Sequence, residues 1–426
     1  MPLLYCLPTA ALQEPSKSRQ RFVSVSSTVS NEMYGEPQRT SELASPITDA
    51  LKDSELDMQS LRPSRVDIDL EALASNVRLI KAKVGADTGI MAVVKANAYG
   101  HGAVAVARTA LRNGASCLAV ANMAEALQLR RAGMAAPILV LSYVPVDAVG
   151  VAVQHDITVS LFDIGQMVRF QNIARATGGT LKTHIKVDSG MGRLGILPDD
   201  AEALATNLRA CEAILAEGIY THFSVADEDP HYTAQQRATF VDVVATMRES
   251  GCGFRYVHAA NSAATVNPAA DGFNLVRPGL LIYGLKPCES ATSLEGLQPV
   301  MSWKTVIAQV KTLPPDSPVG YGNSYRTRGE EKIAVLPVGY ADGLRRSPRP
   351  WREVLVHGRR APLAGRVSME KTTINVSHIP DVIAGDEVVL LGKQGDDEIS
   401  ADEVAAWIDS INYEVLSTIL PRVPRI

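Results

Sequence analysis

Hydrophobic and polar positions alternate regularly between residues 65 and 284. Short apolar runs rich in β-branched residues are separated by amphipathic stretches whose apolar residues recur at helical spacing. The apolar runs predict strands at residues 90–94, 117–121, 138–142, 157–161, 181–187, 219–223, 254–258 and 280–283. The amphipathic stretches predict helices at residues 103–112, 123–131, 164–176, 201–211 and 234–248. Eight predicted strands, most of them followed by a helix, favour a (β/α)₈ barrel over an open sheet.

The pattern changes after about residue 298, where strand-like runs follow one another with Gly, Pro and Asp turns between them. These runs predict strands at residues 302–310, 332–337, 354–357, 361–367, 372–376 and 387–391, with one helix at 401–409. We therefore expect a (β/α)₈ barrel at residues 61–297 and a separate, mainly β domain at residues 298–426, joined near residues 287–296.

The first 60 residues differ from the rest because they are rich in Ser, Thr, Pro and Gln and show no sustained periodicity. This composition predicts a flexible N-terminal extension. The first 30 residues contain three basic residues, Lys17, Arg19 and Arg21, and one acidic residue, Glu14. This charge balance would also suit a targeting segment. A dispensable tail is the interpretation that the sequence favours.

Composition excludes several classes of partner. The net charge of the 426 residues is −4 with acids and bases interspersed, so we expect neither nucleic acid nor an acidic membrane as a partner. The five cysteines lie far apart without metal-ligand spacing, which predicts reduced thiols and no metal site in a cytoplasmic protein. No apolar run reaches the roughly 18 residues that a membrane span needs.

Lys95 lies at the downstream end of the first apolar run, in AVVKANAYGHG at residues 92–102. A lysine at a strand's exit from an α/β core is partly desolvated, which disfavours its ammonium form. A neutral amine can condense with an aldehyde or take a proton. A solvated lysine at a strand end is the alternative. Tyr99, Gly100, His101 and Gly102 occupy the following turn, however, and this composition favours a ligand site.

Polar residues and glycines follow several other predicted strands. They are Lys186, Asp188 and Arg193 in KVDSGMGRLG, His222 in THFSVADE, Asn261 and Ser262 in HAANSAAT, and Arg277, Gly279 and Leu280 in NLVRPGLLIYG. Each has an ordinary alternative, such as a glycine-rich turn, a strand-end histidine bonded to backbone, a helix cap or a surface ion pair. Because a barrel enzyme collects its reactive groups at the C-terminal ends of the strands, we expect them to share one site.

Together these groups suit pyridoxal 5′-phosphate, which needs an amine, a phosphate cradle and polar partners for its ring. The amine would be Lys95. Hydroxyls and backbone amides can form a phosphate cradle without a lysine. The candidate cofactor contacts are Tyr99, His222, Asn261, Ser262, Arg277, Gly279 and Leu280.

From Ser64 to Ile426 the chain resembles the alanine racemase family. The motifs that carry the resemblance are AVVKANAYGHG, KVDSGMGRLG, VGYADG at residues 338–343 and INYEVLSTILPRVPRI at the C-terminus. The resemblance implies a (β/α)₈ barrel followed by a β domain, dependence on pyridoxal 5′-phosphate, and interconversion of L- and D-alanine. It also implies a cytoplasmic homodimer with shared active sites that supplies D-alanine for peptidoglycan.

The resemblance also implies roles for single residues. Lys95 matches the lysine that binds the cofactor and moves a proton at one face, and Tyr340 in VGYADG matches a tyrosine that works at the other face from the partner subunit. Substrate contacts are implied for Arg193 and Met369, phosphate contacts for Tyr99, Ser262, Gly279, Leu280 and Tyr413, a contact with the pyridine nitrogen for Arg277, and carbamylation for Lys186.

Other functions remain open on the sequence alone. Ser368 and Glu370 replace residues that are frequently Cys and Asp in the family, so a serine racemase or a broader racemase of small amino acids is the first alternative. A non-catalytic carrier of the cofactor and a decarboxylase of the same architecture belong to other classes. The segment VGYGNSYR, residues 319–326, is expected at the substrate entrance or at the dimer interface.

Overall fold

The computed structural model describes residues 62–267, 272–287 and 294–426. The expected flexible extension and residues 288–293 of the expected joining segment lie outside these ranges. Within the described residues, no helix has both the length and the apolar character that a membrane crossing requires.

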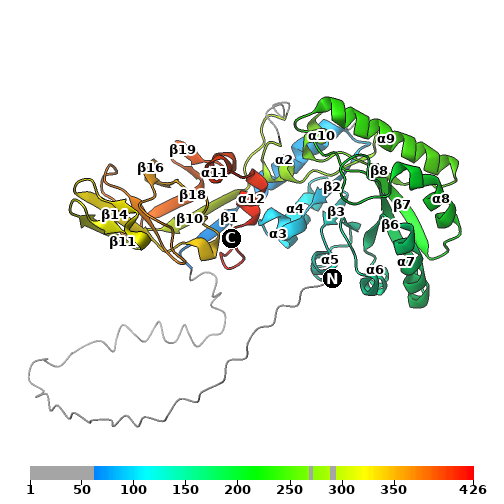
Figure 1. The fold of residues 1–426 in the computed structure, drawn as a ribbon, viewed down its shortest axis with the longest axis horizontal. Coiled ribbons are helices and arrows are strands. Elements are labelled where there is room, and N and C mark those ends of the chain that lie inside the picture. Colours follow the sequence, from blue (N-terminus) through cyan, green and yellow to red (C-terminus); the bar gives the residue numbers. More distant parts are fainter. Residues whose placement is uncertain (1–61, 268–271, 288–293) are drawn as a thin grey trace, which may run out of the picture. The chain divides into compact units, whose positions relative to one another are not determined.

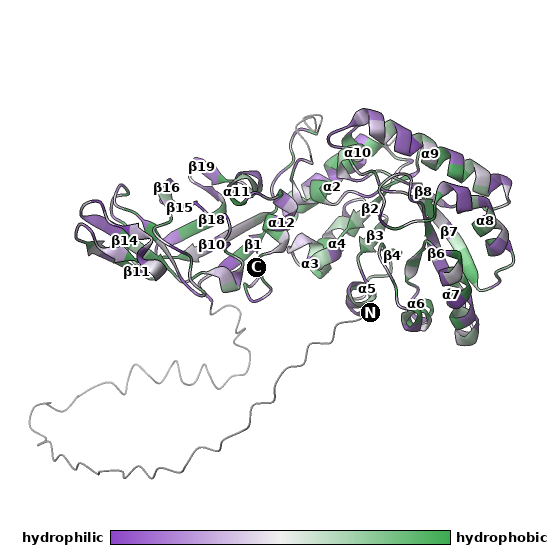
Figure 2. Ribbon diagram, in the orientation of Figure 1, coloured by the Kyte–Doolittle hydropathy of each residue, from purple (hydrophilic) through white to green (hydrophobic). Residues whose placement is uncertain are grey.

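Eight parallel strands form one sheet in the order β8-β7-β6-β5-β4-β3-β2-β9, curved into a nearly closed barrel (Figure 1). The strands are β2 (Gly89–Val93), β3 (Cys117–Val120), β4 (Ile138–Val140), β5 (Thr158–Leu161), β6 (Leu181–Lys186), β7 (Ile214–Tyr220), β8 (Tyr256–His258) and β9 (Leu275–Val276). Neighbouring strands pair in parallel register, for example Ala119 opposite Leu139. Hydrophobic residues concentrate on these strands, whereas the surrounding helices carry both kinds of residue (Figure 2).

Several of the helices that follow the strands begin where the sequence provides a capping side chain. Asp69, Asn122, Asp163 and Asp229 each accept a hydrogen bond from a backbone N–H of the first turn of the helix that follows. The helices of this region are α2 (Leu70–Val84), α3 (Lys95–Tyr99), α4 (Ala103–Arg112), α5 (Met123–Arg131), α6 (Val149–Gln154), α7 (Ile164–Thr177), α8 (Ala201–Arg209), α9 (Pro230–Glu249) and α10 (Ser262–Val266).

Two predicted strands of the barrel are placed differently in the structure, and the run at residues 302–310 forms two strands, β10 (Met301–Val306) and β11 (Gln309–Leu313), in place of the one expected. The expected strand at residues 280–283 is a 3₁₀ helix, η4 (Leu280–Tyr283), and the eighth strand is β9, a few residues earlier. The four residues of η4 are buried on all sides, so their apolar run carries no period, and Gly284 ends them with φ +79°. The strand expected at residues 219–223 is β7 (Ile214–Tyr220), and its beginning was missed because Glu217 and a glycine interrupt the apolar run.

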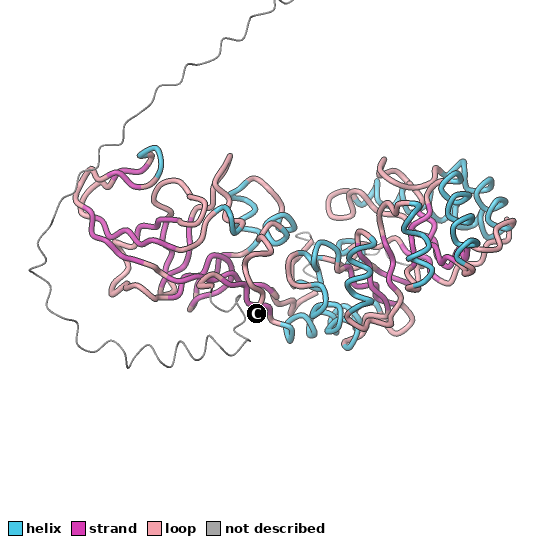
Figure 3. The backbone as a smooth tube through the Cα atoms, turned by 90° about the horizontal axis from the view of Figure 1, so that it is seen from below, coloured by secondary structure: helices cyan, strands magenta, loops and turns pink. Residues whose placement is uncertain are grey.

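The β domain contains a second hydrophobic core, distinct from that of the barrel. Its main sheet has the order β1-β10-β18-β15-β16, with β19 on β18, and smaller sheets are β11-β14-β17 and β12-β13. Strands and loops make up most of this domain, whereas helices are abundant in the barrel (Figure 3). Trp303 and Trp407 each meet Trp351 edge to face in this core. The elements are β1 (Arg65–Ile68), β10 (Met301–Val306), β11 (Gln309–Leu313), β12 (Pro318–Val319), β13 (Tyr325–Arg326), β14 (Glu331–Leu336), β15 (Glu353–Val356), β16 (Arg359–Pro362), β17 (Thr372–Asn375), β18 (Glu387–Gln394), β19 (Asp397–Ile399), α11 (Ala401–Ile408) and α12 (Asn412–Ser417).

Strand β1 precedes the barrel in sequence but pairs with β10 in the β sheet. The last residues of the chain run beside it, since Ile68 N–H donates to the carbonyl of Ile426 at 2.8 Å and Ile426 N–H to Val66 at 2.8 Å. The β domain therefore includes a strand from before residue 298. The exact domain limits stay a prediction.

Candidate active site

A cavity of about 550 Å³ lies where the barrel strands end. It collects residues from the exits of β2, β6, β7, β8 and β9, as expected for a barrel enzyme. The predicted site residues that line it are Lys95, Tyr99, Lys186, Arg193, His222, Asn261, Ser262, Arg277, Gly279, Leu280 and Tyr413. Tyr340 and Met369 do not line it. They line a second cavity together with Tyr321 and Arg346.

Lys95 begins a left-handed turn. Ala96, Asn97, Ala98 and Tyr99 all have φ between 52° and 55°, a conformation that costs non-glycine residues about 1–2 kcal/mol each. Burial lowers the pKa of the Lys95 amine, and the positive charge of Arg193 lowers it further. The turn thus presents an amine that gives up its proton more easily than an exposed lysine.

Neutral hydrogen-bonding groups converge on one end of the cavity. The hydroxyl of Ser262 accepts hydrogen bonds from the N–H groups of Gly279 at 3.0 Å and Leu281 at 3.4 Å. A Cβ atom on Gly279 would lie 2.6 Å from the hydroxyl oxygen of Tyr99, so only glycine lets these groups approach. Burial raises the pKa of Tyr99, which keeps its hydroxyl a donor. Asn261 caps α10 by accepting from Ala264 N–H at 3.0 Å.

This end of the cavity fits a phosphate group, because hydroxyl and backbone donors can surround its oxygens. Lys95 and the buried Arg277 line the same cavity. The residues present therefore fit pyridoxal 5′-phosphate, which requires an amine for its aldehyde as well as a cradle for its phosphate.

Arg277 is held rigidly by four contacts. Its guanidinium donates to the carbonyls of Thr221 at 2.8 Å and Ala259 at 2.9 Å, and to Nδ1 of His258 at 2.8 Å. Nδ1 of His222 lies 3.4 Å from it. Burial lowers the pKa of Arg277 to about 10, so it remains charged at neutral pH. It can donate to a ring nitrogen without giving up a proton.

Two histidines behind Arg277 were not predicted as site residues. His258 and His184 are buried in the barrel, and Nε2 of His258 lies 2.8 Å from Nδ1 of His184. Burial, followed by the charge of Arg277, lowers the pKa of both rings. The signal that could have identified them is a histidine inside a predicted strand, in THIK and YVHAA.

Lys186 is 6% exposed, and its ammonium nitrogen lies 5.1 Å from the centre of the Tyr220 ring. Burial lowers its pKa to about 8, helped by the charges of Arg277 and Arg193. A substantial neutral fraction at this pKa makes the amine available for reaction with carbon dioxide.

Arg193 ends a turn that one carboxylate organises. Asp188 accepts hydrogen bonds from the N–H groups of Gly190, Met191, Gly192 and Arg193, all between 2.8 and 3.0 Å. The motif DSGMGR is therefore built around its aspartate, which leaves the Arg193 side chain free to line the cavity.

Tyr340 and Met369 lie on two turns that are joined through the backbone. Tyr340 N–H donates to the carbonyl of Ser368 and Ala341 N–H to that of Met369, both at 3.0 Å. A Cβ atom on Gly339 would lie 2.3 Å from the Ser368 carbonyl oxygen. The VGYADG motif thus requires its first glycine for contact with the Met369 turn.

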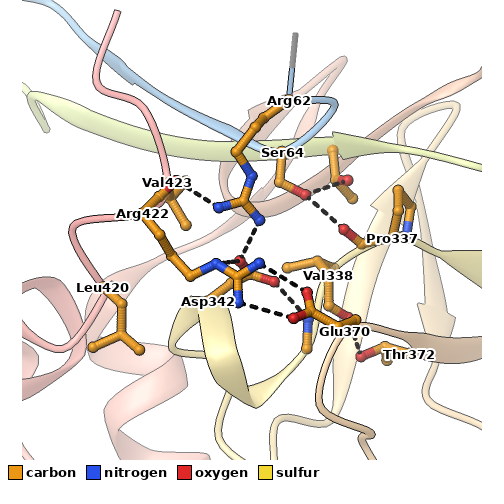
Figure 4. Close-up of polar contacts among 12 residues, drawn as sticks. Arg62, Ser64, Pro337, Val338, Asp342, Glu370, Thr372, Leu420, Arg422 and Val423 are labelled. Atoms are coloured by element: carbon orange, nitrogen blue, oxygen red, sulfur yellow. Dashed lines mark hydrogen bonds and ion pairs between the residues drawn. The ribbon is translucent and has the colours of Figure 1, made fainter. Parts of the chain in front are cut away.

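Arg422 ties the same two turns together with its side chain (Figure 4). Its guanidinium holds both carboxylate oxygens of Glu370 at 2.9 Å, and its Nε lies 3.4 Å from the buried carboxylate of Asp342. Arg62 also donates to Asp342, at 2.8 Å. The turns that carry Tyr340 and Met369 are therefore held together by ion pairs as well as by backbone hydrogen bonds.

Tyr321 is a further candidate that the sequence did not single out. It shares the second cavity with Tyr340 and Met369, and its side chain is more exposed, 66% against 40% for Tyr340. Gly320, with φ +72°, precedes it in a turn. The glycines on both sides of this tyrosine in VGYG were the available signal.

Among the residues that the structure describes, no group of three or more His, Cys, Asp or Glu side chains could hold a metal ion.

Known proteins are similar to this chain in both sequence and fold. Residues 68–287 match the alanine racemase N-terminal domain and residues 300–426 match the alanine racemase C-terminal domain. The chain belongs to the alanine racemase family.

Several alanine racemases are similar over nearly their whole length. The one from Methanococcus maripaludis is 42% identical over 367 residues, which cover 85% of this chain and 98% of that protein. The crystal structure of alanine racemase from Bacillus anthracis is 42% identical with a TM-score of 0.81, covering 86% of this chain and 95% of that one. The alanine racemase from Streptomyces coelicolor has a TM-score of 0.82 at 36% identity, covering 87% of this chain and 99% of that one.

These matches confirm three predictions. The chain is in the expected family, it has the expected barrel and β domain, and its relatives are racemases, which are isomerases. The proteins above carry the name alanine racemase throughout.

Proposed function

We propose that this protein interconverts L- and D-alanine with pyridoxal 5′-phosphate held in the barrel cavity. The observation that carries the proposal is the meeting of the desolvated Lys95 amine, Arg193 and the donors around Ser262 in one cavity. The relative from Bacillus anthracis was solved with bound L-Ala-P, which is consistent with an alanine-sized ligand in a site of this family.

Lys95 would bind the cofactor aldehyde, and Tyr99, Ser262, Gly279, Leu280 and Tyr413 would surround its phosphate. When bound, the cofactor withdraws electrons from the amino acid and so acidifies its α-proton. Arg277 would donate to the ring nitrogen and keep its own proton, which limits charge delocalisation into the ring and disfavours transamination.

The chain's residues would then position the substrate and move its proton. Arg193 would bind the carboxylate of the amino acid, and Met369 would contribute its backbone N–H from the partner subunit. Lys95 would take or return the α-proton at one face. Racemisation also needs a proton-handling group at the opposite face, because the proton must leave one side and return to the other.

We propose that Tyr340 of the partner subunit supplies this second group. Within one chain Tyr340 lines a different cavity from Lys95, so the site would be completed only in a homodimer. Tyr321 is a second candidate for the same role, because it lines the cavity of Tyr340 and is more exposed. The product D-alanine would serve peptidoglycan synthesis in the cytoplasm. Serine is the alternative substrate, since one added hydroxyl is hard for a small pocket to reject.

Variants of three residues test this function. Lys95→Ala should lose the absorbance of the bound cofactor and all exchange of deuterium from solvent into either enantiomer of alanine. Tyr340→Phe and Tyr321→Phe, measured separately, should identify which tyrosine is the second proton-handling group. Replacing that tyrosine should abolish racemisation, while Lys95 still exchanges the α-proton of one enantiomer.

Mixing two inactive proteins tests the shared site. An equimolar mixture of Lys95→Ala with the inactive tyrosine variant should recover about a quarter of wild-type activity after subunit exchange. Half of the dimers would then be hybrids, and each hybrid would contain one intact site of two. No recovery after subunit exchange, or full racemisation by both tyrosine variants, would contradict the partner-subunit mechanism.

A further inference from the structure

The left-handed turn after Lys95 needs external support. Four consecutive non-glycine residues in this conformation persist only where surrounding groups hold them. Three side chains bond to the turn or its end: Asn97 accepts from Ala103 N–H at 2.9 Å, His101 Nδ1 lies 2.9 Å from the Ala98 carbonyl, and Arg425 donates to the Gly100 carbonyl at 2.8 Å. These contacts lie downstream of Lys95.

Glu125, in the first turn of α5, supports the turn immediately next to Lys95. One carboxylate oxygen accepts from the N–H of Ala96 at 2.7 Å, and the other accepts from the N–H of Ala121 at 2.7 Å. Ala96 and Ala121 line the cavity, whereas Glu125 is not among its lining residues. Glu125 therefore links the segments that follow β2 and β3 without lining the cavity itself.

An ordinary helix cap does not explain this arrangement. Glu125 is three residues after the N-cap Asn122, a position from which a glutamate usually bonds back to the N–H of the cap residue. Here the two oxygens go instead to Ala121, before the cap, and to Ala96 on another element. The second bond adds nothing to α5, so it serves the Lys95 turn.

Charge gives Glu125 a second effect on Lys95. Arg193 and Glu125 are the charged side chains that act on the pKa of Lys95, and Lys95 in turn lowers the pKa of Lys186 and His222 at neighbouring strand exits. Arg193 lowers the pKa of Lys95, whereas the Glu125 carboxylate raises it. Glu125 thus limits how far burial and the cations lower the pKa of the Lys95 amine.

We propose that Glu125 is a positioning residue for Lys95, one that fixes the direction of the amine by clamping the strained turn to the end of β3. The proposal rests on the proposed role of Lys95 in binding the cofactor and moving the substrate proton.

The first test measures the clamp without using activity. Glu125→Gln keeps one acceptor but places an NH₂ group against the other backbone N–H. Hydrogen exchange at the amide that loses its acceptor, Ala96 or Ala121, should become at least about tenfold faster in the purified full-length protein. The matched control is Asp163→Asn, which changes a carboxylate that caps α7 of the same barrel by accepting from Gln166 N–H at 2.6 Å. That variant should leave both amides unchanged.

The second test measures the effect on Lys95. In Glu125→Gln the acidic limb of kcat against pH should move to lower pH, because the Lys95 amine is free to take a proton only in the substrate complex. We expect kcat to be reduced about tenfold and KM to change less than about threefold. Glu125→Asp keeps the charge but is one methylene shorter. It should exchange faster at Ala96 while its acidic limb stays near the wild-type position, and it decides the question if Glu125→Gln does not fold.

Unchanged exchange and an unchanged acidic limb in Glu125→Gln would overturn the proposal, as would equal changes in Asp163→Asn. If the purified wild-type protein racemised no amino acid, the proposed function would fail, but the exchange measurement would still decide whether Glu125 holds the turn.

Discussion

Arg277 donates a hydrogen bond to Nδ1 of His258 at 2.8 Å. Because a guanidinium has no acceptor, this contact places the proton of the His258 ring on Nε2. His258 then donates through Nε2 to Nδ1 of His184, 2.8 Å away. One arginine thus sets the tautomers of two buried rings, and burial together with its charge keeps both rings neutral.

The buried histidines predict a loss of stability at acidic pH. Burial lowers the pKa of His184 to about 3 and of His101 to about 4, far below about 6.5 for an unfolded histidine. Above pH 6.5 the rings are neutral in both states and this stability is fully present. As pH falls from 6.5 towards the folded pKa values, the unfolded chain takes up protons that the folded chain does not, so the free energy of unfolding decreases.

Each such histidine contributes a slope of up to about 1.4 kcal/mol per pH unit in this window. Urea unfolding between pH 7.5 and 5.5, at a fixed cofactor concentration, measures the total slope. His184→Asn should make it shallower by about one proton, whereas His231→Gln, at an exposed position, should leave it unchanged. Equal slopes for both variants would contradict the assignment.

Gly279→Ala should weaken cofactor binding. The added Cβ would lie 2.6 Å from the Tyr99 hydroxyl oxygen and 3.2 Å from its ring carbon, so the ring must move away from the phosphate cradle. Overpacking of this kind costs about 1–3 kcal/mol, which corresponds to a rise in the cofactor dissociation constant of about tenfold or more. Absorbance titration measures it. Gly253→Ala is the control, because its Cβ would meet no atom within 4 Å.

Gly339→Ala should separate the Tyr340 turn from the Met369 turn. The new Cβ would lie 2.3 Å from the Ser368 carbonyl oxygen and 2.4 Å from that of Met369. Because both contacts are with backbone, they cannot be relieved by a side-chain rotation. We expect racemisation to fall by about 100-fold or more if both turns build the proposed site. Gly329→Ala, with no atom within 4 Å of its Cβ, should retain wild-type kinetics.

Lys186 should carry a carbamate at neutral pH and above. Its pKa of about 8 leaves a neutral fraction that can react with carbon dioxide, and the product would be an anion next to Arg193. Incubation of the purified protein with ¹³C-bicarbonate should give a carbamate carbon signal in NMR spectra. The signal should be absent from Lys186→Ala and present in Lys182→Ala, which removes a half-buried lysine of the same strand that pairs with Asp156.

Much of the fold and the barrel half of the site could be predicted from the sequence. Helices such as α4 and α5 were predicted with their bounds, because one face is apolar and the next strand follows at once. Most of the residues named at strand exits line one cavity, since parallel strands end at one rim. Asp188 does not line it and instead holds the turn before Arg193. The predicted strand at residues 280–283 was wrong because a fully buried segment gives no periodic signal.

Other parts of the site depend on contacts that distant segments make. Glu125 looked like an ordinary helix residue, and its bond to Ala96 spans 29 positions. The left-handed turn itself leaves no pattern, since alanines at residues 96 and 98 favour right-handed helix. Whether Tyr340 or Tyr321 completes the site depends on a second subunit, and the sequence of one chain does not distinguish two phenols on one surface.

Arg425, near the end of the β domain, reaches Gly100 at the end of the turn that begins with Lys95. Its other donors hold the carbonyls of Ile419, Leu420 and Val423, so it moves with the final loop of the chain. A chimera that exchanged β domains between two relatives would therefore also exchange a support of the amine. Grafting for altered substrate choice should keep residues 419–426 with their own barrel.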